Sequence, residues 1–167
     1  MNTFQYAHYI ARQDKADGSR LSYADLFRLA LHKAYRMPSV RQYDYSALEA
    51  DIKQREAIIK RCKAEKAVVM AAVMRGIRLG YAVSVYDGEE WAVKRSTDVK
   101  VISDSLQSTD ADRVLFVDQQ GKGVGSLWAF YGNSAGEVIA DHTISPTMDL
   151  IMAPAERAME QYAERGI

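Results

Sequence analysis

The sequence predicts an α+β fold: N-terminal helices including one long helix, then a five-stranded, mainly antiparallel sheet with one inserted helix and a C-terminal helix. Two observations lead to this fold class. Apolar residues recur at spacings of three and four up to residue 79, whereas they alternate with polar residues from residue 81 onward. Short turns containing glycine separate the apolar runs of the second half, and such turns join antiparallel strands. We therefore divide the chain into a basic helical region at 1–79 and an acidic α+β region at 80–167.

The first two helices are expected at residues 3–16 and 23–36. Ser22, with Asp25 three positions later, matches the capping-box pattern, in which a hydroxyl accepts from the first free N–H groups of a helix. Pro38 ends the second helix, because the residue before a proline is disfavoured in helical conformation.

The third predicted helix is the longest, since helical periodicity continues from Ser46 to Leu79 and Gly80 provides a stop. A helix of this length would span about 50 Å. Residues 67–74 are apolar on all sides, so they must be buried. We expect this helix to break, to project, or to pack against the earlier helices or a second subunit. The sequence therefore predicts a homodimer through the 46–79 helix.

The second half begins with a β-hairpin at residues 81–95. Asp87-Gly88 is typical of a two-residue turn, in which both residues have positive φ. Trp91 follows on the return strand, and its side chain is expected to anchor the core. Asp98 then caps a short helix whose apolar residues share one face.

Three further strands and a helical tail complete the predicted order ββαβββα. The strands are expected at residues 113–118, 124–131 and 137–143. Pro146 begins the helical tail, and Pro154 marks either a kink or the first turn of a last helix.

The charge of the chain is balanced overall but divided between its halves. The 167 residues include 22 Lys and Arg and 22 Asp and Glu. Residues 1–80 hold fifteen basic and eight acidic residues, a balance of +7, whereas residues 81–167 hold seven and fourteen, a balance of −7. Such asymmetry indicates two surfaces with different partners, or two halves that attract each other or a second copy.

Composition and the apolar runs favour a cytoplasmic protein. Cys62 is the only cysteine, so an internal disulfide is excluded. The N-terminus lacks the charged lead and apolar segment of a signal peptide. No apolar run approaches the roughly 18 residues of a membrane span, so we expect no membrane association.

Residues 84–98 have the sequence SVYDGEEWAVKRSTD, and shorter motifs follow at 108–110 (STD), 131–133 (YGN) and 138–143 (VIADHT). Together these stretches resemble a group of uncharacterised small accessory proteins of bacteriophages and mobile elements of proteobacteria, over roughly residues 80–160. The resemblance implies a bacterial host cell as the location and a host or phage protein as the partner. Some accessory proteins of this kind inhibit bacterial defence systems, including CRISPR complexes. It transfers no functional residues.

Asp141-His142 is the pair that most resembles a catalytic site, because a carboxylate can orient an imidazole for proton transfer. However, adjacent residues on a strand point to opposite faces, so this pair needs a distant partner. Cys62 lies among basic residues, but no base that could activate its thiol is identifiable. Asp141 and His142 are better explained as polar residues at the end of a strand, and Cys62 as a residue packed in the core, than as catalytic residues.

Other candidate sites for chemistry lack the spacing that their function requires. His8 and His32 do not belong to any set of His, Cys or Asp residues spaced for a metal ion. The glycine-rich stretch at 121–125 lacks the Lys-Ser/Thr ending of a phosphate loop, and a strand follows it. We predict no catalytic residues, no metal site and no cofactor, and hence not an enzyme.

Two stretches have the composition of a partner-binding surface. Tyrosine and arginine, which are enriched in interface hot spots, gather after the second helix. The acidic turn of the first hairpin offers a contact patch of opposite charge. The predicted partner-binding residues are Tyr35, Arg36, Arg41, Tyr43, Tyr45, Asp87, Glu89 and Glu90.

The sequence thus predicts a non-enzymatic protein-binding accessory protein, with inhibition of a host defence complex such as CRISPR as the role that the resemblance implies. The alternative is a nucleic-acid-binding protein, because basic helices can bind phosphates. An enzyme of unknown class is the second alternative. The residues of the nucleic-acid alternative are Lys53, Arg55, Lys60, Arg61, Lys63 and Lys66.

Overall fold

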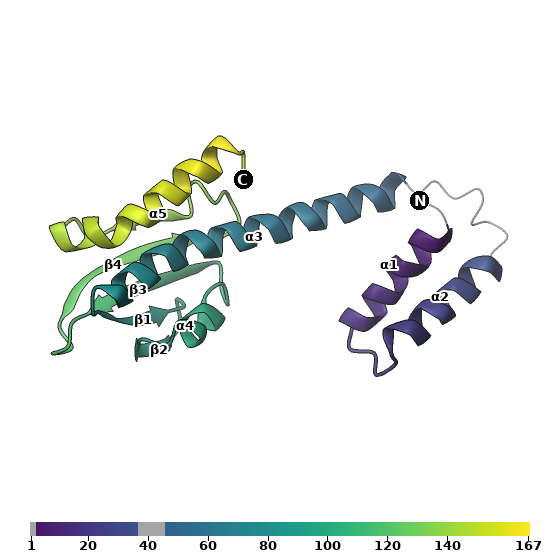
Figure 1. Ribbon diagram of the computed structural model, residues 1–167, viewed down its shortest axis with the longest axis horizontal. Helices are drawn as coiled ribbons and strands as arrows, with labels where there is room; N and C mark the ends of the chain where they lie inside the picture. Colours follow the sequence, from purple (N-terminus) through teal and green to yellow (C-terminus); the bar gives the residue numbers. More distant parts are fainter. Residues whose placement is uncertain (1–2, 37–45) are drawn as a thin grey trace. The chain divides into compact units, whose positions relative to one another are not determined.

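The structure is a computed structural model that describes residues 3–36 and 46–167. These residues form five helices and a five-stranded antiparallel sheet in the predicted order, which confirms the α+β fold class (Figure 1). The helices are α1 (Thr3–Ala16), α2 (Tyr23–Arg36), α3 (Ser46–Arg78), α4 (Val99–Ser105) and α5 (Pro146–Glu164). The strands are β1 (Ala82–Tyr86), β2 (Trp91–Ser96), β3 (Ala111–Val117), β4 (Gly123–Phe130) and β5 (Ile139–His142).

The chain divides into two compact units, residues 1–55 and residues 56–167. The boundary lies inside α3 and not at the predicted position 79/80. The reason is that the second half of α3, including Val68 and Val73, is buried in the same core as the strands. This division reduces the charge contrast. The first unit holds nine basic and six acidic residues (+3), and the second holds thirteen and sixteen (−3).

In the first unit, α1 and α2 lie side by side as a helical hairpin (Figure 1). Ser22 Oγ accepts from the backbone N–H of Asp25 at 3.2 Å, which confirms the predicted cap of α2. Phe27 stacks on His8 with ring centroids 4.0 Å apart. The buried contacts between the two helices are mostly small side chains, namely Ala7, Ala11, Leu26, Ala30 and Ala34.

In the second unit, the sheet has the strand order β2-β1-β3-β4-β5, and each neighbouring pair is antiparallel. The chain passes from β2 at one edge to β3 on the far side of β1, and α4 lies within this crossover. Asp98 caps α4 as predicted, because its carboxylate accepts from the N–H groups of Lys100 and Val101. The remaining strands follow one another as hairpins.

The core of this unit lies between one face of the sheet and a layer of helices. Val69 of α3, Ile102 of α4 and Ile151 of α5 belong to one buried cluster with the strand residues that face them. The side chain of Gln107, just after α4, donates to the carbonyl of Cys62 at 2.9 Å, which fixes this end of α4 against α3. Within residues 56–167, α3, α4 and α5 therefore cover the same face of the sheet, and no helix covers the other face.

The turn of the first hairpin differs from the prediction. Tyr86 pairs with Trp91, so four residues connect the strands instead of two. Only Gly88 has positive φ, whereas Asp87 accepts from the N–H groups of Glu89 and Glu90 and holds the turn in a different form. The prediction that Trp91 anchors the core is also wrong, because its side chain is 40% exposed.

The C-terminal helix α5 continues through Pro154, so of the two predicted alternatives for this proline, the first turn of a separate last helix is wrong. Proline has no N–H group, and the carbonyl four residues earlier, that of Leu150, therefore lacks its usual helical donor. Arg75 of α3 replaces that donor, since its Nε donates to the Leu150 oxygen at 3.3 Å. An arginine side chain thus compensates for the proline.

The long helix α3 buries most of its apolar second half inside its own unit, but the prediction that all of residues 67–74 are buried is wrong at its two ends, because Ala67 and Met74 are exposed. Val68, Val69 and Val73 are fully buried. The apolar surface that led us to predict a homodimer is therefore largely covered, whereas Ile58 and Ile59 in the first half are exposed. The homodimer stays a prediction. Among the helices that the described residues form, none combines the length and the apolar character needed to cross a membrane.

Two carboxylates lie fully buried where α3 meets the sheet. Glu65 Oε1 accepts from the backbone N–H of Gly132 at 2.9 Å. Asp112 Oδ2 accepts from the Tyr131 hydroxyl at 2.8 Å and from the Gln107 N–H at 3.0 Å. Burial raises the pKa of Asp112, although both hydrogen bonds oppose this effect. These bonds connect α3, the end of α4, β3 and the residues after β4.

Candidate functional site

The uncovered face of the sheet carries the candidate functional site. Side chains alternate between the two faces along each strand. On β3, Val114 and Phe116 are fully buried against the helices, whereas Arg113 and Leu115 point to the other face and are more accessible. The same alternation on β4 places Leu127 with the core and Trp128 on the uncovered face.

The strand register aligns the uncovered residues into one row across all five strands. Trp91 of β2 pairs with Tyr86 of β1, and Tyr86 pairs with Arg113 of β3. Arg113 pairs with Trp128 of β4, and Trp128 pairs with Asp141 of β5. Because paired residues share a face, these side chains are neighbours although their positions range from 86 to 141 in the sequence.

The side chains of this row contact one another. The rings of Tyr86 and Trp91 have centroids 5.4 Å apart, and the guanidinium carbon of Arg113 lies 5.5 Å from the centroid of the Trp128 ring. Phe130 extends the row along β4, with its ring 6.3 Å from that of Trp128. We call Tyr86, Trp91, Arg113, Trp128 and Phe130 the aromatic sheet face.

The aromatic sheet face is partly held in place and partly exposed. The guanidinium of Arg113 donates from Nε and Nη2 to the Ser126 hydroxyl, at 3.3 Å each. Trp91 and Phe130 leave 40% and 45% of their surface exposed. Exposed aromatic residues that gather on one face are typical of an interaction surface, whereas single exposed apolar residues scattered over a protein are not.

A shallow hollow of about 470 Å³ continues the face beyond Trp91. Lys94 and Arg95 provide its positive charge. Arg95 has a φ of +50°, and its backbone N–H donates to the Ser84 hydroxyl at 2.9 Å. A non-glycine residue in this left-handed region is uncommon, so the Ser84 contact and the Arg95 bond to the Gly121 carbonyl hold a strained segment at the hollow.

The predicted acidic patch lies at the edge of this face. Asp87 stabilises the turn, because its carboxylate accepts from the N–H groups of Glu90 and Glu89. These two hydrogen bonds also hold the pKa of Asp87 below its ordinary value. Glu89 and Glu90 are exposed in the turn that leads directly into Trp91. The carboxylates therefore add negative charge next to exposed aromatic side chains.

The other predicted partner-binding residues come from residues 35–45, outside the second unit that carries this face. Tyr35 and Arg36 form the end of α2 in the first unit. Arg41, Tyr43 and Tyr45 lie outside the residues that the structure describes. Their role in binding stays a prediction.

The cations of the nucleic-acid alternative are divided between the two units. Lys53 and Arg55 belong to the first unit, where Arg55 pairs with Asp51 at 3.0 Å. Lys60, Arg61, Lys63 and Lys66 belong to the second. Arg61 Nε lies 3.7 Å from the buried carboxylate of Glu65, so its charge is partly compensated.

The residues singled out for catalysis or metal binding do not assemble a reactive set. Asp141 lies at the end of the aromatic row, whereas His142 pairs with Leu127 and so points to the helix-covered face. The prediction that the two side chains diverge is confirmed. Throughout the described residues, no three His, Cys, Asp or Glu side chains are close enough to hold a metal ion.

Sequence reasoning missed the aromatic sheet face because it assigned Trp91 to the core. A signal was present: Trp128 and Phe130 alternate with the apolar Leu127 and Ala129, which shows two aromatic residues on the side opposite the aliphatic ones.

Comparison with protein-family models, with curated proteins and with solved structures finds no match to this chain.

Proposed function

We propose that this protein is a non-enzymatic binding protein that docks a partner protein on the aromatic sheet face. One observation carries the proposal: Trp91, Tyr86, Arg113 and Trp128 lie side by side across four strands, on a face that no helix of residues 56–167 covers. Tryptophan, tyrosine and arginine are the residue types that dominate interface hot spots, since each combines a large contact area with a polar group.

The charge around the face favours a protein partner over a nucleic acid. Glu89 and Glu90 are exposed beside Trp91, and Asp141 pairs with Trp128 at the other end of the row. Aromatic platforms that stack nucleic-acid bases are combined with a positively charged path for the phosphates. The carboxylates at both ends of the row would repel phosphates, although Lys94, Arg95 and Arg113 add positive charge to the same face. The face thus carries both signs of charge, which a protein surface can match.

The resemblance to accessory proteins of phages and mobile elements supports a bacterial host protein as the partner. Within this proposal, the protein acts by occupying a functional surface of that partner, as an inhibitor of a host defence complex such as CRISPR would. The bonds that hold Arg113 to Ser126 suit such a role, because a side chain that is already held loses little conformational entropy on binding.

The double substitution Trp91→Ala with Trp128→Ala is expected to weaken binding of the partner at least tenfold, since truncating hot-spot residues costs about 2 kcal/mol or more each. The full chain is used to capture partners from a bacterial lysate, and the affinity of each recovered protein is measured by titration. A partner that binds both proteins equally contradicts the proposal.

The matched control replaces exposed apolar residues elsewhere in the same unit, Val101→Ala with Ile144→Ala, which are 48% and 93% exposed. This variant is expected to retain the wild-type affinity. Thermal unfolding of both variants shows whether the fold is intact. Loss of the exposed side chains in the control is expected to change stability little, whereas Trp128 is half-buried, so the double tryptophan variant is expected to unfold at a lower temperature but cooperatively.

A further inference from the structure

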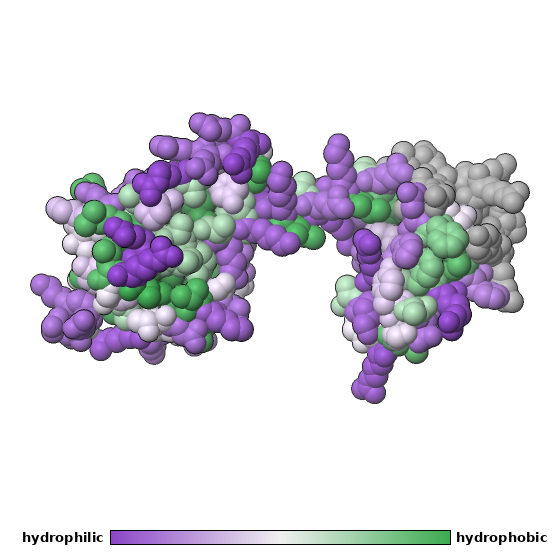
Figure 2. Space-filling view, in the orientation of Figure 1, coloured by the Kyte–Doolittle hydropathy of each residue, from purple (hydrophilic) through white to green (hydrophobic). Residues whose placement is uncertain are grey.

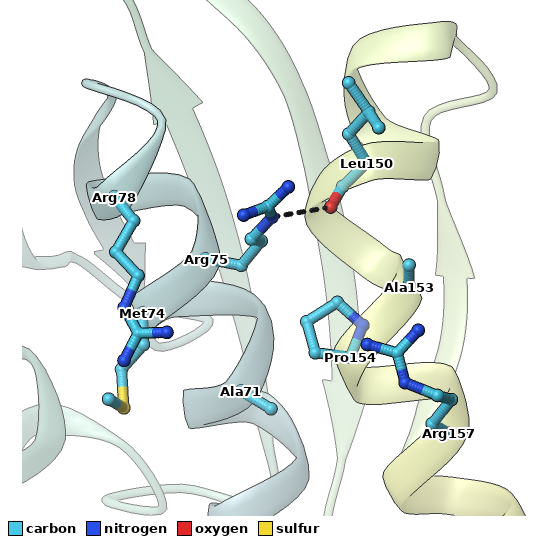
Figure 3. Close-up of a pocket in the computed structure, with 8 residues that line it drawn as sticks. All are labelled: Ala71, Met74, Arg75, Arg78, Leu150, Ala153, Pro154 and Arg157. Atoms are coloured by element: carbon cyan, nitrogen blue, oxygen red, sulfur yellow. Dashed lines mark hydrogen bonds between the residues drawn. The ribbon is translucent and has the colours of Figure 1, made fainter.

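A groove runs between α3 and α5 on the helix layer, away from the aromatic sheet face. Each helix contributes four residues at spacings i, i+3, i+4 and i+7, which is the pattern of one helix face. The groove encloses about 550 Å³, within the range of small-molecule sites. Its lining is Ala71, Met74, Arg75 and Arg78 from α3 and Leu150, Ala153, Pro154 and Arg157 from α5 (Figure 3).

The charged residues that line this groove are all arginines. Arg75 and Arg78 come from α3 and Arg157 comes from α5, and no carboxylate belongs to the lining. Across the part of the chain that the structure describes, the ion pairs do not involve these three guanidinium groups. Figure 3 shows Arg75 and Arg157 extending into the space between the helices, whereas the Arg78 side chain runs along α3 at the margin of the groove. Like charges that face one groove without a counter-charge repel one another, although the unit as a whole has a net charge of −3. An anion in the groove would relieve that repulsion.

The arrangement of Arg75 depends on the proline in α5. Figure 3 shows the Arg75 side chain extending from α3 toward α5, where its Nε donates to the Leu150 carbonyl. That carbonyl is free for the arginine because Pro154 has no N–H to offer it. The bond uses one guanidinium N–H and leaves the terminal nitrogens for a ligand. Fixing an arginine before binding reduces the entropy lost when it contacts an anion.

The groove also offers apolar surface beside the charges. Met74 is 38% exposed and Leu150 is 55% exposed, and Ala71, Ala153 and Pro154 form apolar parts of the lining. Over α3 and α5, Figure 2 shows hydrophobic side chains beside strongly hydrophilic ones. A ligand that fits both features has an anionic group and an organic part.

We propose that the groove between α3 and α5 is a binding site for a small organic phosphate. Arg75 and Arg157 hold the phosphate groups, Arg78 adds positive charge at the margin, and Met74, Leu150 and Pro154 contact the organic part. Guanidinium groups match phosphate oxygens with paired hydrogen bonds, and several phosphate charges balance three arginines better than one carboxylate does. The size of the groove favours a small molecule over a nucleic-acid duplex.

The test is isothermal titration calorimetry of the full-length chain with four probes: ATP, inorganic pyrophosphate, glutamate and duplex DNA. Saturable binding is expected for ATP and pyrophosphate, with the tighter binding for ATP because of its organic part. Glutamate is expected not to bind. The triple substitution Arg75→Gln, Arg78→Gln and Arg157→Gln is expected to weaken ATP binding at least tenfold.

The matched control removes the same net charge from exposed positions of α3 outside the groove, Lys53→Gln, Lys60→Gln and Lys63→Gln. It is expected to bind ATP as the wild type does. Three results would overturn the proposal: neither phosphate probe binds saturably, both triple variants lose binding equally, or only duplex DNA binds.

The Pro154→Ala substitution tests the arrangement of Arg75 while all three charges stay. The new N–H at position 154 can bond to the Leu150 carbonyl and displace Arg75 Nε. ATP affinity is expected to fall about threefold, while heat-induced unfolding moves to a higher temperature because proline inside a helix is unfavourable. Unchanged affinity in a folded variant would refute the positioning role of Pro154.

Discussion

Substituting Gly76→Val is expected to lower the free energy of unfolding by about 3 kcal/mol, because the site has no room for a side chain. A Cβ atom at Gly76 would lie 2.5 Å from Cε1 and 2.6 Å from Cδ1 of Phe116. Phe116 is fully buried on β3, so neither its ring nor α3 can move away without disturbing the core. Urea unfolding monitored by circular dichroism measures the effect.

The control for this prediction is Ala67→Val, which adds a β-branched side chain to the same helix at an exposed position. It is expected to cost less than about 1 kcal/mol, as helix propensity dictates. Shortening the opposing side chain with Phe116→Leu in the Gly76→Val background is expected to recover part of the loss. If the two substitutions are additive, the close contact between α3 and β3 is not the cause.

Substituting Asp112→Ala is expected to destabilise the second unit by about 3 kcal/mol, because two donors would lose their acceptor. These donors are the Tyr131 hydroxyl and the Gln107 N–H. Asp112→Asn keeps an oxygen that can accept from both, so it is expected to cost about 1 kcal/mol or less. A large loss in both variants would show that the negative charge, and not the two hydrogen bonds, is what the fold requires.

The same residue gives the stability a dependence on pH. Burial raises the pKa of Asp112 in the folded protein above its ordinary value of 3.8, so the folded state binds the proton more tightly than the unfolded state. Its contribution is therefore fully present below pH 3.8 and is lost as the pH rises through the raised pKa. The free energy of unfolding of the wild type minus that of the Asp112→Asn variant is therefore expected to decrease as the pH rises from 3.8 through the raised pKa. A difference that increases with pH would reverse this assignment.

The sequence predicted the elements whose signals are local. Ser22 and Asp98 identified helix starts by their capping oxygens, and both caps form. The change from helical spacing to alternation after Gly80 located the sheet, because these two periods follow from backbone geometry alone. The Asp87 turn was predicted incorrectly, since a side chain that bonds to its own backbone can select a longer turn.

The sites depend on relations that single elements do not contain. Alternation shows which residues share a face of a strand, but only the register places Tyr86 beside Arg113 and Arg113 beside Trp128. The groove likewise requires α3 and α5 to lie next to each other, although 75 residues separate Arg75 from Leu150. The bond between Glu65 and Gly132 spans 67 residues, and no local pattern indicates it.

The strand order leaves β2 and β5 as the outer strands of the sheet. Unpaired backbone groups at such edges can template intermolecular sheet extension and aggregation. Here β5 has only four residues and includes Asp141, whereas β2 contains register irregularities and the charged pair Lys94-Arg95. Both features oppose edge-to-edge pairing. The protein can thus expose tryptophan on a sheet without polymerising through its edge strands. A binding partner is expected to contact the side chains of the sheet face and not to pair with an edge as an added strand.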